Sequence, residues 1–388
     1  MPRIILLTDF SEEYANNLLK GIVQYSKGRD SWVLCKMPLS YRDLYEVEGV
    51  LEWALRWKAD GIIAQFYNTD NVGIFKENGI AAIAQDFKQR FTEIPNITGA
   101  HFFAGQMGAN YFLKKGFKHF AFYGFKGIVW SEERSEGFKS EISKHGYEDN
   151  FSEYQNIKSE ELWFYESAPL MEWLRNLPKP VAIMTCDDNQ GHHIIEVCNQ
   201  CGLKVPEEVS VLGVDNDEII CTLSDPSLSS IQQDVEKGGY DAARLMEKMI
   251  KKPEARFEDV VVNPTHIVTR QSTDIYASDD HYISLALRYI HQHSDQKLSV
   301  DDIVRLVPLS RRLLETRFRE VTGFSVYSYM LNLRIDKFAE KLIETDDSIV
   351  EIALEMGFSD YKNISRQFKT IKGCTPSEYR ALALSRRQ

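Results

Sequence analysis

Residues 349–359 read Ile-Val-Glu-Ile-Ala-Leu-Glu-Met-Gly-Phe-Ser, and an earlier stretch of the chain repeats their apolar spacing. Residues 300–307 carry valine and isoleucine at positions i, i+3, i+4 and i+7, and residues 349–356 carry apolar side chains at the same spacing. This spacing places the apolar side chains on one face of a short helix. A turn and a second amphipathic segment follow each copy, so the sequence predicts two helix-turn-helix units.

The two copies end alike but differ in one turn. Each second segment is followed by the pattern Gly-x-Ser/Thr-Val/Pro-x-x-Tyr, at residues 323–329 and 373–379. Pro308 stands in the first turn, whereas Gly357 stands in the second. Because proline fixes φ near −65°, we expect the first turn to differ in geometry from the second.

Cationic and hydroxyl side chains are expected on the outer face of the second helix of each unit. Arginine and hydroxyl groups bind phosphates and guanine edges, and carboxylates accept hydrogen bonds from cytosine. An ordinary solvated helix surface is the alternative, but two such faces in a duplicated pattern favour DNA binding. The candidate DNA contacts are Arg311, Arg312, Glu315, Thr316 and Arg319 in the first unit, and Asp360, Tyr361, Lys362, Ser365 and Arg366 in the second.

Residues 283–388 resemble the AraC/XylS-type DNA-binding domain, in which a long helix joins two helix-turn-helix units. The matching stretches are residues 333–343, 349–360, 365–369 and 373–380. The resemblance implies an all-α domain that contacts operator DNA at direct or inverted half-sites. Charge agrees with this division, because residues 279–388 hold 17 Lys and Arg against 16 Asp and Glu, whereas the rest holds 29 against 41.

Residues 1–270 alternate short apolar runs with longer amphipathic segments, which is typical of parallel sheets covered by helices. This length exceeds what one sheet needs, so we expect two α/β lobes with a ligand between them, at the carboxyl ends of the strands. The expected strands are residues 3–9, 32–36, 61–65, 80–85, 117–124, 180–186 and 209–214, with closing strands at Val261 and 267–269; expected helices include 105–115, 132–145 and 190–201.

Several classes of protein are disfavoured by what the sequence lacks. The 388 residues, 43% hydrophobic and 27% charged, contain no run of 18 apolar residues and no secretory signal, so we expect a cytoplasmic chain without membrane contact. Phosphate-binding glycine loops and hydrolase motifs are missing, so no enzyme is indicated. Cys198 and Cys201 lie near His192 and His193, but buried apolar thiols are favoured over a metal site, and no cofactor is expected.

The N-terminal region resembles the ligand-binding core of LacI-type repressors and periplasmic sugar-binding proteins. Residues 116–124, 187–191 and 205–216 carry the resemblance. It implies that Arg134, Asp188 and Asp215 bind a sugar, with Trp130 as a platform for the sugar ring. Asp9 and Tyr14 follow the first expected strand, so we expect the other lobe to contribute them to the ligand site. Asp188 as a helix cap and Trp130 as lobe packing are the alternatives. Ala100 and His101 replace an acidic or amide residue of the family, which leaves the sugar open.

These interpretations combine into one expected organisation: a sensor at residues 1–272, a linker at 273–282 and a DNA-binding domain at 283–388. We expect a homodimeric transcription activator whose operator binding responds to a sugar, with D-xylose favoured, and which acts on RNA polymerase. The alternatives are the same kind of regulator with another sugar or sugar acid, a binding protein without regulatory output, or a sugar-processing enzyme with a helical interaction module.

Overall fold

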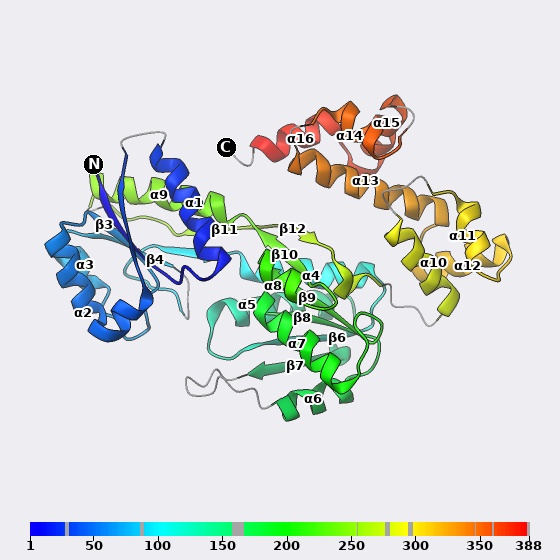
Figure 1. Cartoon of the computed structure of the whole chain (residues 1–388), viewed down its shortest axis with the longest axis horizontal. Coiled ribbons are helices and arrows are strands. Elements are labelled where there is room, and N and C mark those ends of the chain that lie inside the picture. Colours follow the sequence, from blue (N-terminus) through cyan, green and yellow to red (C-terminus); the bar gives the residue numbers. More distant parts are fainter. Residues whose placement is uncertain are drawn as a thin grey trace. The chain divides into compact units, whose positions relative to one another are not determined.

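The computed structural model describes residues 1–27, 31–85, 89–156, 167–253, 255–275, 280–293, 298–345, 347–358 and 361–385. The chain forms two compact units (Figure 1). The first unit comprises Met1–Leu113 and Lys118–Thr273, and the second comprises Asp274–Gln388 together with Lys114–Phe117. None of the helices in the described ranges is long and apolar enough to cross a membrane.

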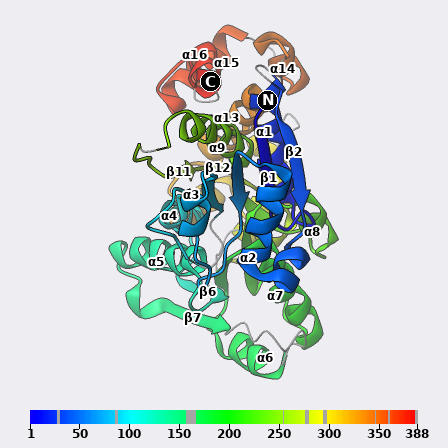
Figure 2. The ribbon, with the colours of Figure 1, turned by 90° about the vertical axis from the view of Figure 1, so that its left-hand side faces the viewer.

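The first unit contains two sheets of six strands each, in what we call lobe 1 and lobe 2. The lobe 1 sheet has the order β11-β5-β4-β3-β1-β2, and all of its strand pairs are parallel. Helices α1, α2, α3 and α9 belong to this lobe (Figure 2). Its elements are β1 Arg3–Leu7, α1 Glu13–Lys27, β2 Val33–Met37, α2 Leu39–Trp57, β3 Gly61–Ala64, α3 Gly73–Glu77, β4 Ala81–Gln85, β5 Asn96–Gly99, α9 Val235–Lys251 and β11 Val260–Val262.

Alternation along the strands builds the two faces of lobe 1. Ile4 and Leu6 of β1 pack with α1 and α9, whereas Ile5 and Leu7 pack on the other face with α2 and α3. This follows from the period of two in a β-strand, which sends successive side chains to opposite faces. Burial on both faces explains why the strands read as continuous apolar runs rather than alternating ones.

Lobe 2 repeats the strand order of lobe 1, as β12-β10-β9-β8-β6-β7. Its edge strand β12 runs antiparallel to β10, which departs from the all-parallel expectation. The elements are α4 His101–Lys114, β6 His119–Phe125, α5 Val129–Lys144, η1 Glu148–Asn150, β7 Phe151–Asn156, α6 Ser167–Asn176, β8 Val181–Thr185, α7 Asp188–Cys201, β9 Val209–Asp215, α8 Glu218–Leu223, β10 Ser229–Gln233, β12 Pro264–Val268 and η2 Gln271–Thr273.

Three crossings of the chain join the lobes: β5 to α4, β10 to α9, and β11 to β12. The crossings are hydrogen-bonded to one another, because Ala100 N donates to Val262 O over 2.8 Å and Asp234 N donates to Asn263 O over 3.0 Å. The crossings therefore form one connected strip between the two sheets.

The second unit is helical within its described residues, and its two halves repeat one packing arrangement. Phe318 and Tyr329 lie edge to face at 5.4 Å and 77°, and Phe368 and Tyr379 do so at the same distance and angle. This confirms the internal repeat. The helices are α10 His281–Gln292, α11 Val300–Leu306, α12 Arg311–Thr322, α13 Val326–Glu344, α14 Ile349–Glu355, α15 Tyr361–Lys372 and α16 Pro376–Ser385.

The turns of the two units differ, as the Pro308 and Gly357 pattern predicts. After α11, Val307 is extended, with φ −121° and ψ 145°. After α14, Gly357 adopts φ 70°, a left-handed conformation that glycine reaches without strain. The side chain of Arg334 on α13 holds this second turn, since Nη2 donates to Met356 O over 2.7 Å and the guanidinium stacks on Phe358 at 4.0 Å.

Candidate functional site

A charged pair lies at the carboxyl ends of the lobe 2 strands. Asp215 ends β9, and its Oδ1 accepts hydrogen bonds from Arg134 Nη2 over 3.2 Å and from Gln233 Nε2. Arg134 also donates to the carbonyl of Cys186, after β8, and only 4% of its side chain is exposed. The Asp215 side chain is 28% exposed. The buried guanidinium therefore fixes a carboxylate that solvent or a ligand can reach.

The loop after β9 has an unusual backbone. Asp215 has φ 102° and Asn216 has φ 54°, conformations that cost non-glycine residues of order 1–3 kcal/mol each. Hydrogen bonds from Asn216 N to Ser230 Oγ (3.0 Å) and from Asn216 Nδ2 to Gln232 Oε1 (2.7 Å) hold this loop against β10. Strain that persists under such fixation is typical of functional loops.

The side chain of Asp188 holds this loop through hydrogen bonds from Asp217 N and Ser230 Oγ. Its side chain is buried, with Oδ1 accepting from Ser230 Oγ over 2.5 Å and Oδ2 accepting from Asp217 N over 2.7 Å. Burial and the neighbouring Asp215 carboxylate raise the pKa of Asp188. The N-cap of α7 is Asp187, whose side chain accepts from Gln190 N, so the alternative that Asp188 caps this helix is wrong. Asp188 is 2% exposed, and its role as a sugar contact stays a prediction.

Trp130 lies close to the charged pair. The guanidinium carbon of Arg134 is 5.4 Å from the centre of its ring, and the ring meets Phe125 edge to face at 6.1 Å. The side chain is half-buried. Both readings of the sequence, a sugar platform and packing within the lobe, are compatible with this position.

The two residues predicted from lobe 1 differ in their surroundings. Asp9 Oδ1 accepts from Ser11 N (2.9 Å) and Ser11 Oγ (2.6 Å), and Asp9 N donates to Gln65 Oε1 over 3.2 Å. Tyr14 is half-buried and packs against the apolar cluster under α1. Both residues follow the carboxyl end of β1, as the sequence predicted.

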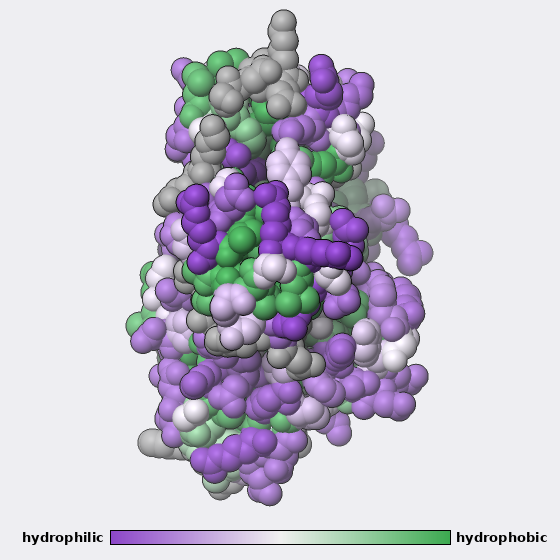
Figure 3. Space-filling view, turned by 90° about the vertical axis from the view of Figure 1, so that its right-hand side faces the viewer, coloured by the Kyte–Doolittle hydropathy of each residue, from purple (hydrophilic) through white to green (hydrophobic). Residues whose placement is uncertain are grey.

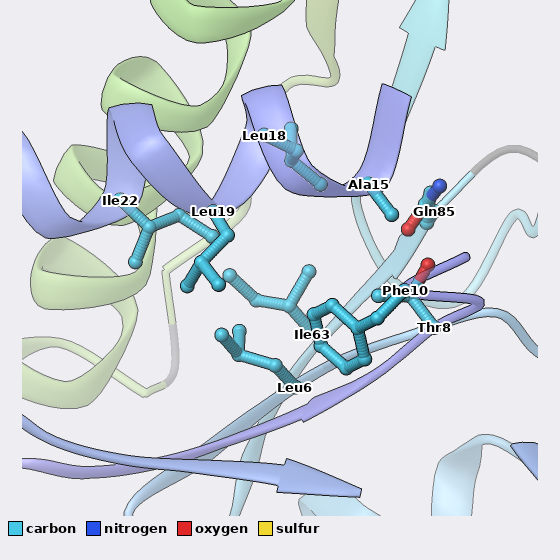
Figure 4. A pocket seen from close by; sticks show the side chains of 9 residues that line it. All are labelled: Leu6, Thr8, Phe10, Ala15, Leu18, Leu19, Ile22, Ile63 and Gln85. Atoms are coloured by element: carbon cyan, nitrogen blue, oxygen red, sulfur yellow. The ribbon is translucent and has the colours of Figure 1, made fainter. Parts of the chain in front are cut away.

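Two neutral groups that the sequence did not single out lie at the same edge of lobe 1. Thr8 and Gln85 are 5% and 4% exposed, and among the described residues neither Thr8 Oγ1 nor Gln85 Oε1 has a hydrogen-bond partner. Figure 4 shows both oxygen atoms beside Phe10 and Ala15, at one end of a cavity lined by Leu6, Leu18, Leu19, Ile22 and Ile63. An unsatisfied buried oxygen costs free energy, so each marks a place for a donor.

Polar contacts between described residues connect the lobes directly. Arg90 of lobe 1 binds Glu133 of α5 in a two-pronged ion pair of 2.6 and 2.7 Å, and its Nε donates to Thr98 Oγ1 over 2.8 Å. Glu13 of α1 accepts a hydrogen bond from Glu218 N at the start of α8, over 2.8 Å. These contacts set how the two lobes approach each other in this structure.

The histidine and cysteine residues noted in the sequence are packed. His101 is buried, and its Nε2 accepts from Gly99 N over 3.2 Å. Cys198 is buried, and Cys201 is partly buried with its thiol directed to Cys198 O. No group of three metal-binding side chains occurs in the part of the chain that the structure covers.

The second helices of the repeated units present cations to solvent. Arg311, Arg312, Thr316 and Arg319 of α12 are exposed, as is Arg366 of α15. Arg311 pairs with Asp301 over 3.0 Å, but both side chains remain largely exposed. Figure 3 shows that hydrophilic side chains predominate on one face of the molecule, with apolar residues gathered between them.

Two of the predicted DNA contacts are directed inward instead. Glu315 is half-buried and accepts from Val326 N over 3.2 Å, which fixes the start of α13. The Ser365 hydroxyl is buried without a partner among the described residues. Both therefore differ from the expected outward placement. Asp360 lies outside the described residues, as do the side chains of Tyr361 and Lys362, although α15 begins at Tyr361.

Comparison with known proteins separates the same two parts. Residues 109–273 match the family of periplasmic binding protein-like domains, and residues 303–382 match the helix-turn-helix domain family. The xylose operon regulatory protein of Escherichia coli (strain K12) is 27% identical over 390 residues, 97% of this chain and 96% of that protein. Its counterpart in Haemophilus influenzae is 27% identical over 387 residues, covering 97% and 98%.

A solved structure extends this likeness to three dimensions. The structure of a xylose-binding transcription activator matches with a TM-score of 0.61 at 27% identity, and it covers 98% of both chains. The chain is a transcription regulator with a sugar-sensing domain. Both relatives align with this chain along almost its whole length, and both are named as operon regulatory proteins. The predicted combination of an AraC-type helix-turn-helix domain with a periplasmic binding protein-like sensor is confirmed.

The sensor residues that sequence reasoning missed share one property: they are polar side chains within or after buried strands. Gln233 binds the Asp215 carboxylate, and Ser230 bridges Asp188 to the backbone of Asn216. The run Ser-Ser-Ile-Gln-Gln at residues 229–233 was not predicted as a strand because it is largely polar. Its position after Val209–Asp215, in the alternating series, was the only signal available.

Proposed function

We propose that this regulator binds D-xylose between the lobes of its sensor and thereby changes the affinity of its helix-turn-helix units for operator DNA. The observation that carries the proposal is the Asp215–Arg134 pair, in a chain that resembles xylose operon regulatory proteins from end to end. Both hydrogen bonds to Asp215 involve Oδ1, which leaves Oδ2 for a sugar hydroxyl. Carboxylates and guanidinium groups suit the vicinal hydroxyls of a pentose.

Each lobe contributes a different half of this proposed site. Lobe 2 supplies Asp215, with Trp130 positioned to meet the apolar face of the sugar ring. Lobe 1 supplies Thr8 and Gln85, whose Oγ1 and Oε1 atoms have no hydrogen-bond partner among the residues described. Gln85 Oε1 would accept from a sugar hydroxyl, and the Thr8 hydroxyl would accept or donate. Asp188 acts through the loop that it holds and is a positioning residue.

For the C-terminal unit we propose that the exposed residues of α12 and α15 contact operator half-sites. Arg311, Arg312, Thr316, Arg319 and Arg366 are the candidates that the geometry supports. A homodimer would present two such units to direct or inverted half-sites, and activation would act through RNA polymerase. The boundary between the compact units, at Thr273 and Asp274, supports the linker at residues 273–282.

The test joins sugar binding to DNA binding. Titration calorimetry of the full chain with D-xylose is expected to show one site per chain. A DNA fragment selected from random sequence by the protein in the presence of D-xylose should bind at least fivefold more tightly with the sugar than without it, a coupling within the usual range. Turnover of D-xylose, or DNA affinity that does not change with the sugar, would contradict the proposal.

A further inference from the structure

The segment that leaves the sensor is fixed to the strands that end in the sugar site. Residues 269–273 follow β12, and Thr273 is the last residue of the first unit. Ser272 and Thr273 are fully buried. We call residues 270–273 the exit segment, because the chain continues from it toward the helix-turn-helix units.

Serine hydroxyls attach the exit segment to β9 and β10. Ser229 Oγ interacts with Arg270 N (2.7 Å), Arg270 O (3.0 Å) and Thr273 Oγ1 (2.7 Å). Ser272 Oγ donates to Val211 O over 2.7 Å and accepts from Ser229 N over 2.8 Å. Strand β9 ends in Asp215 and β10 ends in Gln233. The exit segment is therefore hydrogen-bonded to the same two strands that carry residues of the proposed sugar site.

One side chain connects the exit segment to the strained loop itself. Arg270 Nη2 donates to Asn216 Oδ1 over 2.8 Å, and its Nη1 donates to Leu228 O over 2.9 Å. Asn216 is the residue after Asp215, and both have positive φ. A continuous path therefore runs from the Asp215 carboxylate, through the side chain of Asn216, to the guanidinium of Arg270.

The loop is held in place from several sides, which makes it sensitive to a change at any of them. Ser230 and Asp188 accept hydrogen bonds from its backbone N–H groups. In the side chain of Asn216, Nδ2 donates to Gln232 and Oδ1 accepts from Arg270. A sugar hydroxyl that donates to Asp215 Oδ2 adds a bond to a carboxylate whose Oδ1 is already held by Arg134 and Gln233. Any resulting change of the Asp215 backbone is transmitted to Asn216 because the two are consecutive.

We propose that the Arg270–Asn216 hydrogen bond couples sugar occupancy at Asp215 to the exit segment, and so to DNA binding. Arg270 is a positioning residue in this scheme, since it contacts neither sugar nor DNA. The inference rests on the proposed function and adds to it the residues through which the response travels. Coupling is a difference in free energy between sites, so it is measured as a ratio of affinities rather than as stability.

Two variants break the connection from opposite ends. Arg270→Met keeps a side chain of similar length and removes both bonds of the guanidinium. Asn216→Gly removes the acceptor, while glycine tolerates φ 54° at no steric cost. Arg244→Met is the matched control, because Arg244 is an exposed arginine of α9 that pairs only locally with Asp241, over 2.9 Å.

The experiment measures the D-xylose dissociation constant by calorimetry and the affinity for the selected DNA fragment, with and without saturating D-xylose, by fluorescence anisotropy. We expect Arg270→Met to bind D-xylose within about threefold of the parent chain. The sugar-dependent ratio of DNA affinities should fall toward 1 in both variants, and we expect the control to keep the parent ratio. By linkage, DNA should also cease to raise their sugar affinity.

The outcomes separate this inference from the proposed function. If the parent chain shows no sugar-dependent DNA binding, the proposed function fails, and the inference fails with it. If the parent responds but Arg270→Met and Asn216→Gly respond equally well, the proposed function stands and the coupling path is overturned. Loss of D-xylose binding in both variants would also overturn it, because the residues would then support the sugar site itself.

Discussion

Lobe 1 and lobe 2 of the sensor have the same strand order but hold different chemistry at the carboxyl ends of their strands. In lobe 2 a guanidinium and a carboxylate pair with each other, Arg134 with Asp215, and Asp188 is buried next to the loop after β9. In lobe 1 the Asp9 carboxylate is bound to Ser11, and the groups beside the apolar cavity, Thr8 and Gln85, are neutral. The two lobes thus place side chains at equivalent strand ends, but these side chains have different proposed roles. Lobe 2 orients a polar ligand, and lobe 1 completes the contacts of that ligand.

The largest effect is expected from the charge of lobe 2. Asp215→Asn retains a residue that tolerates positive φ but removes the carboxylate, and charged hydrogen bonds contribute about 1.5–3 kcal/mol each. We expect D-xylose affinity to fall at least about 100-fold, measured by calorimetry. Asp217→Asn is the matched control, because asparagine caps a helix as well as aspartate does and Asp217 caps α8. Equal loss in both variants would remove Asp215 from the site.

A smaller loss is expected from Arg134→Lys. Lysine keeps the positive charge but cannot bind Asp215 and the Cys186 carbonyl at once with a planar fork. D-xylose affinity should fall about 10-fold to 30-fold, with the unfolding midpoint in denaturant lowered as well. Unchanged sugar affinity would show that charge alone, rather than the position of the carboxylate, is what lobe 2 requires.

Lobe 1 should respond with opposite changes in stability and binding. Thr8→Val replaces a buried hydroxyl by a methyl group of the same shape, and a buried unsatisfied polar group costs about 1–3 kcal/mol. We expect the sugar-free protein to gain about 1 kcal/mol of unfolding free energy and D-xylose affinity to fall about threefold to tenfold. Denaturant unfolding and calorimetry measure the two effects. A loss of D-xylose affinity as large as that expected for Asp215→Asn would contradict the difference between the lobes.

The smallest effect concerns the exposed contact between the lobes. Glu13→Gln weakens the hydrogen bond that Glu218 N donates to the Glu13 carboxylate, and exposed charged contacts are worth about 0–1 kcal/mol. We expect D-xylose affinity to change by less than about threefold. A tenfold change would show that lobe approach, and not the polar groups at the strand ends, governs binding.

The second unit was the more predictable part of the molecule, for local reasons. Its caps and turns lie within a few residues of each other: Ser299 and Asp302 form a capping box, as do Ser348 and Glu351. Such signals are readable from spacing alone. The inward direction of the Glu315 side chain could not be predicted from spacing, because its partner, Val326 N, lies on the next helix.

The sensor was predictable in its apolar strands and in the position of Asp215, which follows directly from where a parallel strand ends. Its polar contacts were not predictable, because they join segments far apart in the chain. Ser229 and Arg270 are 41 residues apart and share two hydrogen bonds, and Asp188 reaches Ser230 across 42 residues. Short polar strands such as Ser229–Gln233 are buried only because such distant partners satisfy them.

The most direct test of the central claim is thermal unfolding of the full chain and of Asp215→Asn with D-xylose, L-arabinose, D-ribose and L-rhamnose. At about 100 times its dissociation constant, a ligand stabilises the folded state by roughly 2.7 kcal/mol, which gives a clear shift. The account predicts a shift of the parent chain with D-xylose, and a stabilisation of at most about 0.4 kcal/mol for Asp215→Asn at the same concentration. No shift of the parent with D-xylose, or an equal shift of both proteins, would contradict it.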